Sequence, residues 1–394
     1  MSRSIIRRRS FAVTAALGLF SFAAVTALVA RPAQSFDAAR AALQFWWNIV
    51  FPAMLPYLIL VRIASVYGVH AFAGRLLAPL VRLLRLPAGS GPVLSAGLLH
   101  GGAEGPCRAA RLLARTDPEG AARLAAASAP ANPALVVTVL AVSLLESPGT
   151  APLLLAVHYG SWLAAALALS AIRRKSPAEA AAPDLGTTGF PEESRRPPFG
   201  RTLGDAVTDT LQRLLELGGV IIVFAVAVRQ LSLLGLPRLA GAAGFPLDGF
   251  WATALAAGFF ELHNGLLALA GAAASKAAFC LMSALLAWGG LALQLDVRAR
   301  LRKAGVRYAP SLRFRLVHAA LAAAGAWLLW PAVGPRLRER PAEQAADSAF
   351  LPIPWAEAHG VPGEALCAAA LAVLLLIRRL AASGRGKGGI RRVR

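Results

Sequence analysis

Two short polar stretches interrupt otherwise apolar sequence at corresponding places in the two halves of the chain. The first is AGLLHGGAEGP at residues 96–106, and the second is AGFFELHNG at residues 257–265, which begins 161 residues later (257 minus 96). A second pair, Val157-His158 and Val317-His318, repeats at a spacing of 160 (318 minus 158). Polar breaks at matched points of two hydrophobic halves are typical of transporters whose site lies near the bilayer midplane.

The composition indicates a polytopic membrane protein. Hydrophobic residues make up 57% of the 394 positions and charged residues only 15%, too few to cover the surface of a soluble protein of this size. The net charge of +21 comes from Lys and Arg grouped between the hydrophobic segments, where cytoplasmic loops collect them. We therefore expect the lipid bilayer as a partner and exclude nucleic acid.

The cysteines indicate neither a disulfide framework nor a metal site. Cys107, Cys280 and Cys367 lie far apart and form no CxxC or Cys/His spacing. We expect no metal and no cofactor.

Hydropathy predicts an all-α protein with about eight membrane spans and two re-entrant hairpins. The predicted spans are Phe11–Ala30, Phe45–Val61, Ala131–Leu145, Pro152–Ile172, Leu214–Val228, Ala277–Leu293, Leu316–Trp330 and Ala365–Ile377. Two more apolar runs, Gly91–Leu99 and Gly249–Phe260, are too short to cross, and each leads directly into one polar stretch. Both therefore predict hairpins that enter and leave on the same side of the membrane.

The first apolar run admits two interpretations. Phe11–Ala30 follows Arg3 and the triplet Arg7 to Arg9, as a signal peptide would. The run is uncharged and long enough to span, however, whereas the apolar core of a signal peptide has roughly 7–15 residues. A retained anchor is the favoured interpretation.

Charge predicts the orientation. Basic residues dominate the N-terminus and the segments 62–85, 173–201, 298–315 (Arg313 and Arg315 included) and 378–394, which we place in the cytoplasm together with both termini. Acidic residues match or exceed basic ones between Trp330 and Ala365, so that loop is expected outside. The hairpin around His100 then enters from inside and the one around Glu261 from outside. The order of elements is the same in both halves and the orientation is opposite, which predicts an inverted repeat.

The predicted organisation has six parts. They are an N-terminal anchor (1–44), a first repeat (45–172), a cytoplasmic linker rich in Pro, Ala, Gly and charge (173–204), a second repeat (205–330), an extracytoplasmic loop (331–364), and a last span with a basic tail (365–394). Apolar residues at helical spacing place Asp205–Glu216 along the cytoplasmic interface before the next span.

Several motifs together resemble one known family, the sporulation integral membrane proteins of the YlbJ (SpoVV) type, which contain paired nucleoside-recognition gate domains. The motifs are FWWNIVFPAMLPY at 45–57, Asn132-Pro133, His158-Tyr159, ELHNG at 261–265, and Gly289-Gly290-Leu291 with Gln294. Each is weak alone, and the resemblance covers roughly residues 40–330.

The resemblance implies a multi-pass protein of endospore-forming bacteria, located in the outer forespore membrane. Its implied role is to move dipicolinic acid, a small aromatic dicarboxylate, out of the mother cell. The gate domains also resemble those of concentrative nucleoside transporters. The first hairpin of the family usually carries a Ser-Gly-Tyr-Pro-type sequence followed by a basic residue. This chain instead has HGGAEGP at 100–106 with Arg108 beyond, a departure that bears on substrate identity.

The acids and glycines of the two stretches are the first candidates for substrate contact. Glu261 ends an apolar run, and a carboxylate at membrane depth usually lines a cavity or is paired. It is a candidate proton or cation site, a partner for a basic residue, or the cap of a half-helix. Glu104 is a weaker candidate of the same kind. The glycines Gly101, Gly102 and Gly105 allow close backbone approach to a ligand, although any sharp turn also requires them.

Histidines and amides complete the candidate site. His100 and His263 lie in the matched hairpins and either relay protons or are satisfied hydrogen-bonding residues. His158 and His318 are expected to form interhelical hydrogen bonds. The other candidates are Asn132 (a helix N-cap or a ligand contact), Asn264 beside Glu261, and Gln294.

Two basic residues are candidates for charge recognition. Lys276 either neutralises a substrate carboxylate, pairs with Glu261 or extends to the interface. Arg108 either meets a dianion or belongs to a solvated basic face with Arg111 and Arg115.

The sequence pattern distinguishes four functions. A carrier of a small anionic metabolite is favoured over a nucleoside or nucleobase carrier and over a non-transporting spore-envelope assembly factor. A membrane enzyme is disfavoured, because HExxH and GxSxG are absent from the sequence. Homo-oligomerisation stays open.

Overall fold

The computed structural model describes residues 24–171, 197–235 and 249–338, with five more residues between 15 and 22. Within these ranges the chain is helical and contains no strand. Part of the predicted first span, the predicted last span Ala365–Ile377 and most of the loop 331–364 lie outside the described residues. Five helical stretches are long and apolar enough to cross a membrane: Pro32–Val66, Pro148–Ala171, Phe199–Leu233, Lys276–Lys303 and Ala309–Arg338. The protein is therefore an all-helical, multi-pass membrane protein.

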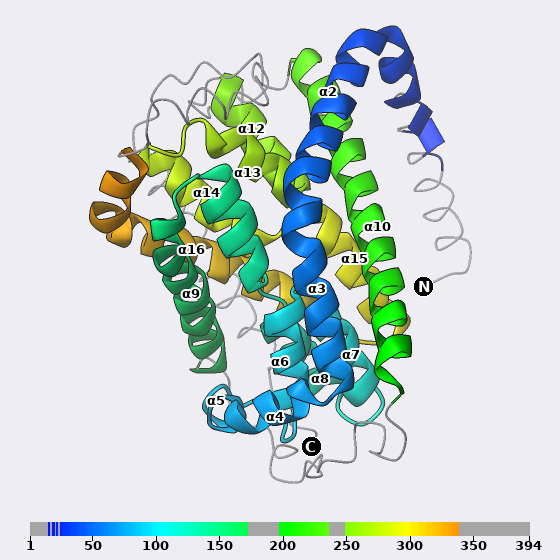
Figure 1. Cartoon of the computed structure of the whole chain (residues 1–394), viewed down its shortest axis with the longest axis vertical. Helices are drawn as coiled ribbons and strands as arrows, with labels where there is room; N and C mark the ends of the chain where they lie inside the picture. The colour runs from blue at the N-terminus through cyan, green and yellow to red at the C-terminus, as the bar shows by residue number, and fades with distance from the viewer. Residues whose placement is uncertain are drawn as a thin grey trace, which may run out of the picture.

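The first half consists of a long helix, two short helices, a helix hairpin, a broken helix and a second long helix (Figure 1). In order these are α2 (Pro32–Phe45), η1 (Trp46–Val50) and α3 (Phe51–Val66), which are continuous, then α4 (Val69–Leu76), α5 (Ala78–Leu83), the hairpin α6 (Gly91–His100) and α7 (Glu104–Leu113), α8 (Pro118–Ala127) with η2 (Leu135–Leu144), the single turn η3 (Pro148–Thr150), and α9 (Ala151–Ala171). The predicted boundary between residues 44 and 45 falls within the continuous first helix.

The second half repeats this order. Its elements are α10 (Phe199–Leu233), the hairpin α12 (Gly249–Phe260) and α13 (Leu262–Ala270), the broken helix α14 (Lys276–Trp288) and α15 (Leu291–Lys303), and α16 (Ala309–Arg338). Each half thus has a long helix, a hairpin, a broken helix and a closing long helix. The match of the two polar stretches in the sequence corresponds to a match of structural elements.

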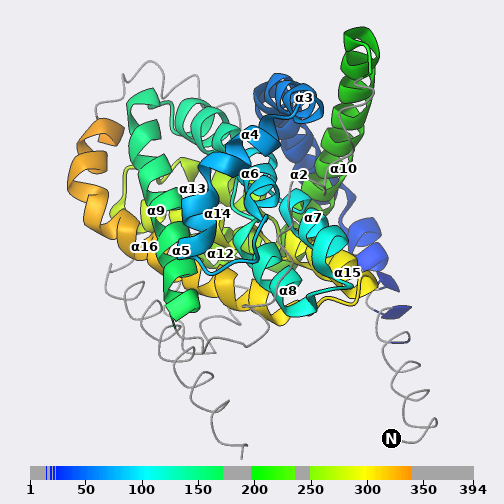
Figure 2. The same cartoon turned by 90° about the horizontal axis from the view of Figure 1, so that it is seen from below.

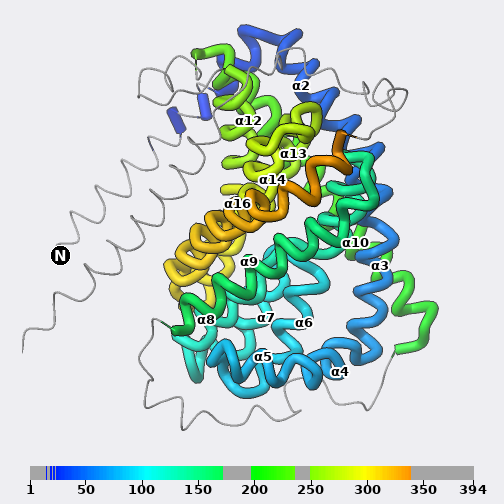
Figure 3. The backbone as a smooth tube through the Cα atoms, turned by 90° about the vertical axis from the view of Figure 1, so that its left-hand side faces the viewer, coloured from blue at the N-terminus to red at the C-terminus, as the bar shows by residue number. Residues whose placement is uncertain are grey.

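The two hairpins lie at opposite ends of the molecule. The helices α6 and α7 are in the lower part and α12 and α13 in the upper part, in both Figure 1 and the side view of Figure 3. The helices α2, α3 and α10 run together along one side, and α9 packs against α16 on the other, as the view from below also shows (Figure 2). The short helices α4 and α5 lie across the lower end (Figure 3).

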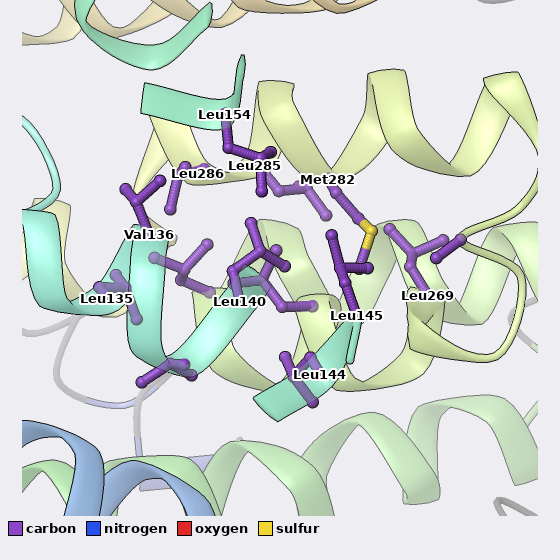
Figure 4. Close-up of a cluster of buried hydrophobic side chains, with 14 of the residues drawn as sticks. Leu135, Val136, Leu140, Leu144, Leu145, Leu154, Leu269, Met282, Leu285 and Leu286 are labelled. Atoms are coloured by element: carbon purple, nitrogen blue, oxygen red, sulfur yellow. The ribbon is translucent and has the colours of Figure 1, made fainter. Parts of the chain in front are cut away.

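Leucine-rich packing around η2 and α14 forms the main core. Leu140, Leu154, Leu269 and Met282 are fully buried and come from η2, α9, α13 and α14, so elements of both halves interdigitate (Figure 4). A buried leucine contributes roughly 1.5–3 kcal/mol relative to exposure in water. Large apolar side chains such as Trp47 remain exposed on the outside, as expected for a surface that faces lipid.

Three predicted segments differ in detail from the structure. In Ala131–Leu145 the helix η2 (Leu135–Leu144) has 10 residues, fewer than a span needs, and residues 128–132 before it are not helical. Ala277–Leu293 lies within the stretch Lys276–Lys303, which is long and apolar enough to cross, but it is interrupted at Gly289 and Gly290, which both have a φ of +80°. The predicted linker extended to residue 204, but α10 already begins at Phe199 and continues without interruption through the predicted interfacial segment.

Candidate functional site

The first hairpin breaks at two glycines, of which the first packs against the broken helix of the same half. Gly101 and Gly102 have φ of +72° and +60°, a conformation that favours glycine. A Cβ atom on Gly101 would lie 2.9 Å from the backbone nitrogen of Asn132. The Asn132 amide donates to the His100 carbonyl at 3.0 Å, and its oxygen accepts from the Leu135 N–H at 2.8 Å. The predicted N-cap role of Asn132 is confirmed, and the same side chain ties the two breaks together.

The helix α9 satisfies the backbone groups that this broken helix leaves free. Tyr159 donates its hydroxyl to the Ala131 carbonyl at 3.0 Å, and the Ala131 N–H donates to Nε2 of His158 at 3.1 Å. The Trp162 indole donates to the Ala127 carbonyl at 2.8 Å. Inside a membrane such partners are required, because there is little water to replace them.

The second hairpin breaks at Glu261, whose backbone is extended. Its carboxylate accepts from the Asn264 N–H at 2.9 Å, which caps α13, and its other oxygen lies 2.8 Å from Nδ1 of His263. The Asn264 side chain donates to the Ile221 carbonyl on α10 at 2.9 Å. Glu261 is 4% exposed, so a titratable acid is held in a buried position next to an imidazole. Within the described residues, Nε2 of that imidazole has no hydrogen-bond partner.

The second broken helix packs Gly290 against Glu261. A Cβ atom on Gly290 would lie 2.8 Å from the nitrogen of Leu262 and 3.1 Å from Cα of Glu261. The Gln294 amide donates to the Trp288 carbonyl at 2.6 Å and accepts from the hydroxyl of Tyr308. Gln294, a predicted substrate contact, therefore binds the end of α14 through its amide nitrogen and the segment before α16 through its amide oxygen.

The two halves meet where the first hairpin approaches α15. A Cβ atom on Gly102 would lie 3.8 Å from a methyl group of Leu293. Leu293 in turn lies beside Gly289. The four breaks thus form one contiguous region, in which His100, Gly101 and Asn132 of the first half lie on one side and Glu261 and Gly290 of the second half on the other.

Glu104 and Arg108 lie in the first turns of α7 and are paired with each other. The carboxylate of Glu104 contacts the guanidinium of Arg108 at 2.8 Å and that of Arg213 on α10 at 3.1 Å. Gly105 packs so tightly that a Cβ atom there would lie 1.9 Å from the Ser128 carbonyl oxygen. The glycine therefore serves helix packing between α7 and the first broken helix.

Lys276 lies away from Glu261. Its ammonium group is 3.2 Å from the ring centre of Trp327 on α16, a cation–π contact. The pairing of Lys276 with Glu261 that we considered is not formed, since the ion pair of Glu261 is with His263.

The remaining histidines form contacts between helices. His318 on α16 lies 3.1 Å from the carbonyl of His158 on α9, with ring centres 4.9 Å apart, so their predicted interhelical bonding is confirmed. His100 lies 3.2 Å from the Ala96 carbonyl, and its ring is 5.3 Å from that of His70. No cluster of three or more metal-ligating side chains occurs in the described part of the chain.

Sequence reasoning missed one residue of this region, Arg315. Its position after a basic loop placed it among the cytoplasmic charges. In the structure it is buried, with 4% exposure, and donates to the Ala287 carbonyl at 3.0 Å. The signal that would identify it is its place three residues before His318, on the same helical face.

Fold and site together define a multi-pass membrane protein with two helix hairpins and two broken helices joined at their breaks. The chain belongs to the family of the sporulation integral membrane protein YlbJ. It is 30% identical to the protein of that name from Bacillus subtilis (strain 168) over 327 residues, which cover 77% of this chain and 79% of that protein. No protein-family model and no solved structure matches the chain.

Proposed function

We propose that this protein is a transporter that moves dipicolinic acid from the mother cell across the outer forespore membrane. The observation that carries the proposal is the meeting of four helix breaks inside an otherwise apolar bundle. Breaks at membrane depth are tolerated where they are buried in protein or line a path for a substrate. A protein that only holds the spore envelope together has no need for them.

The helix ends at these breaks suit an anionic substrate. The starts of α13 and η2 are capped by their own side chains, Glu261 and Asn132. The helices α7 and α15 begin without a side-chain cap. Free N–H groups at a helix start attract negative charge, which dipicolinate carries on two carboxylates.

The amides of the region favour this substrate over a nucleoside. Asn132 and Gln294 use both their donor and their acceptor within the protein, and the Asn264 side chain donates to backbone. Neutral hydrogen-bonding recognition of a nucleobase would need such groups to be available. Uridine and dipicolinate can be compared as competitors of dipicolinate transport. Equal inhibition by the two would favour the nucleoside carrier instead.

We further propose that the two halves form an inverted repeat, with both chain termini in the cytoplasm. The opposite placement of the two hairpins supports this topology (Figure 1). In this arrangement the first hairpin enters from the cytoplasmic side and the second from the other side, and the substrate passes between their breaks.

Glu261 is the proposed coupling residue. Within the described ranges the hydrogen-bond partners of this buried carboxylate are an N–H and an imidazole, which suits a group that takes up a proton as the site changes access. Replacement by glutamine keeps the cap of α13 and removes the charge.

The test is complementation of Bacillus subtilis that lacks YlbJ, with dipicolinate measured separately in spores and mother cells. We expect this chain to restore spore dipicolinate, and Glu261→Gln to lower it about tenfold, which corresponds to about 1.4 kcal/mol. Quantification of the protein in membranes controls for expression. Mother-cell accumulation that persists although the wild-type chain is present in membranes would contradict the transport proposal. Full transport by Glu261→Gln would remove only the coupling role.

A further inference from the structure

Arg315 is a buried cation without an acidic partner. It lies in the second turn of α16 and is 4% exposed. None of the ion pairs formed within the described ranges involves it, and its one hydrogen bond there goes from Nη1 to the Ala287 carbonyl at 3.0 Å. By contrast, the equally basic Arg108 and Arg213 share the carboxylate of Glu104.

Capping of α14 does not account for an arginine at this position. A cation near the last carbonyls of a helix is favourable. A guanidinium has five N–H donors, however, and desolvating it costs several kcal/mol unless negative charge compensates. One carbonyl contact uses one donor, and glutamine or lysine could provide it.

The guanidinium lies beside the glycine break that precedes α15. Its Nη1 is 3.1 Å from the position that a Cβ atom of Gly289 would occupy. The next residue, Gly290, is the N-cap of α15 and offers no side chain to the free N–H groups of the first turn. Leu293 in that turn meets Gly102 of the first hairpin, so the break faces the other half of the molecule.

A second donor without a partner lies near the same helix. His318, one turn after Arg315, contacts the carbonyl of His158, and both imidazoles are at least 99% buried. Nε2 of His158 accepts from the Ala131 N–H, so a neutral ring carries its proton on Nδ1. In the described part of the molecule that Nδ1 has no hydrogen-bond partner. Within the described residues these basic and donor groups form no ion pair with an acid, since the carboxylate of Glu261, next to Gly290, pairs with His263.

We propose that Arg315 forms the anion subsite of the transported molecule, where its guanidinium binds one carboxylate at the uncapped start of α15. The inference rests on the proposed function for the identity of the ligand. It goes further by assigning charge recognition to a residue of α16 and not to Arg108 or Lys276, which are engaged by Glu104 and Trp327. A planar guanidinium matches a carboxylate with two parallel hydrogen bonds.

The experiment measures binding to the purified full-length protein in detergent by calorimetry. The ligands are dipicolinate, its neutral analogue pyridine-2,6-dicarboxamide, and benzoate. Arg315→Gln is expected to raise the Kd for dipicolinate about 10–100-fold, the usual range for loss of a charged hydrogen-bond partner, and to change the Kd for the diamide by less than about threefold. Arg313→Gln, two residues earlier and exposed, is the matched control and should bind like the wild type.

The outcomes separate a binding role from a structural one. Unchanged dipicolinate affinity in Arg315→Gln, or an equal loss for dipicolinate and the diamide, overturns the subsite. If the glutamine variant does not fold, Arg315→Lys is the deciding variant. It keeps the charge and loses the two parallel N–H donors of the guanidinium. The Kd for dipicolinate should therefore rise about three- to tenfold while the Kd for the diamide stays unchanged. Equal affinities of Arg315→Lys and wild type for dipicolinate overturn the assignment.

The outcomes also distinguish the two proposals. A wild-type protein that binds benzoate in an Arg315-dependent manner but does not bind dipicolinate retains the subsite and loses the proposed substrate. A wild-type protein that binds none of the carboxylates overturns both.

Discussion

Each half of the molecule has one break that is capped by a side chain and one break that is formed by glycines. The hairpin and the broken helix exchange these two roles between the halves. In the first half the hairpin breaks at Gly101 and Gly102, and the broken helix is capped by Asn132. In the second half the hairpin is capped by Glu261, and the broken helix bends at Gly289 and Gly290. A residue with a capping side chain therefore always packs against a glycine.

This exchange shows that both halves keep the pairing of a capping side chain with a glycine, and not the element that carries each. Where two interrupted helices cross, one needs a side chain that accepts a backbone N–H, and the other must lack a Cβ atom to come close enough. Either element can take either part. The comparison predicts that breaking the glycine side of a pair is costlier than removing the cap, and that charges outside the pairs matter least.

The largest effect is expected for Gly290→Ala. The added Cβ would meet the Leu262 nitrogen at 2.8 Å in a left-handed conformation, so strain and overpacking should lower the free energy of unfolding by about 2–4 kcal/mol. Thermal unfolding in detergent measures the change. Gly219→Ala is the control, since no atom lies within 4 Å of its added Cβ on α10, and it should be neutral or slightly stabilising. Equal melting temperatures for the two variants would refute close packing at the break.

A smaller effect is expected for Asn132→Ala. The substitution leaves the Leu135 N–H and the His100 carbonyl without their partner, at a cost of about 1–3 kcal/mol. Asn132→Ser keeps a hydroxyl that can accept the Leu135 N–H and loses the amide that donates to His100, so its loss should be the smaller of the two. The same unfolding measurement ranks them. A loss for serine equal to that for alanine would mean that the bridge to the hairpin, and not the cap, is the main contribution.

The smallest effect is expected for Glu104→Gln. Its partner Arg213 is 52% exposed and Arg108 is 18% exposed, so solvent screens much of the attraction. We expect a loss of about 1 kcal/mol or less in the free energy of unfolding, and less of it at high salt. A loss as large as that of Gly290→Ala would show that Glu104 belongs to the central arrangement after all.

The hairpins were predictable because their polar residues stand out from apolar runs. His100, Glu104 and Glu261 lower the local hydropathy at two matched places, and turn-forming glycines accompany them. The order of elements in each half followed from the same pattern.

The breaks in the other two helices were hidden for different reasons. Gly289 and Gly290 are compatible with an apolar span, so the local hydropathy does not fall at these residues. Their positive φ in the structure reveals the bend. Asn132-Pro133 was recognised as a helix start, but the sequence did not show that the Asn132 amide also bonds to the first hairpin. Arg315 was misplaced because charge predicts a loop, whereas packing of α16 against α14 buries it. Apart from the spacing of Arg315 to His318, such a tertiary contact leaves no pattern in the local sequence.

Hydrogen bonds between the halves also set the order in which the chain can assemble during synthesis. The bond between Asn132 and His100 spans 32 residues and is available as soon as the first half is inserted. The bonds from Trp46 to the Leu214 carbonyl and from Gln230 to Ser35 join residues 168 and 195 positions apart. Contacts this distant close late, because the intervening chain must first be made. Until α10 arrives, the indole of Trp46 lacks the acceptor that Leu214 later provides, and the face of α2 and α3 that α10 covers stays open.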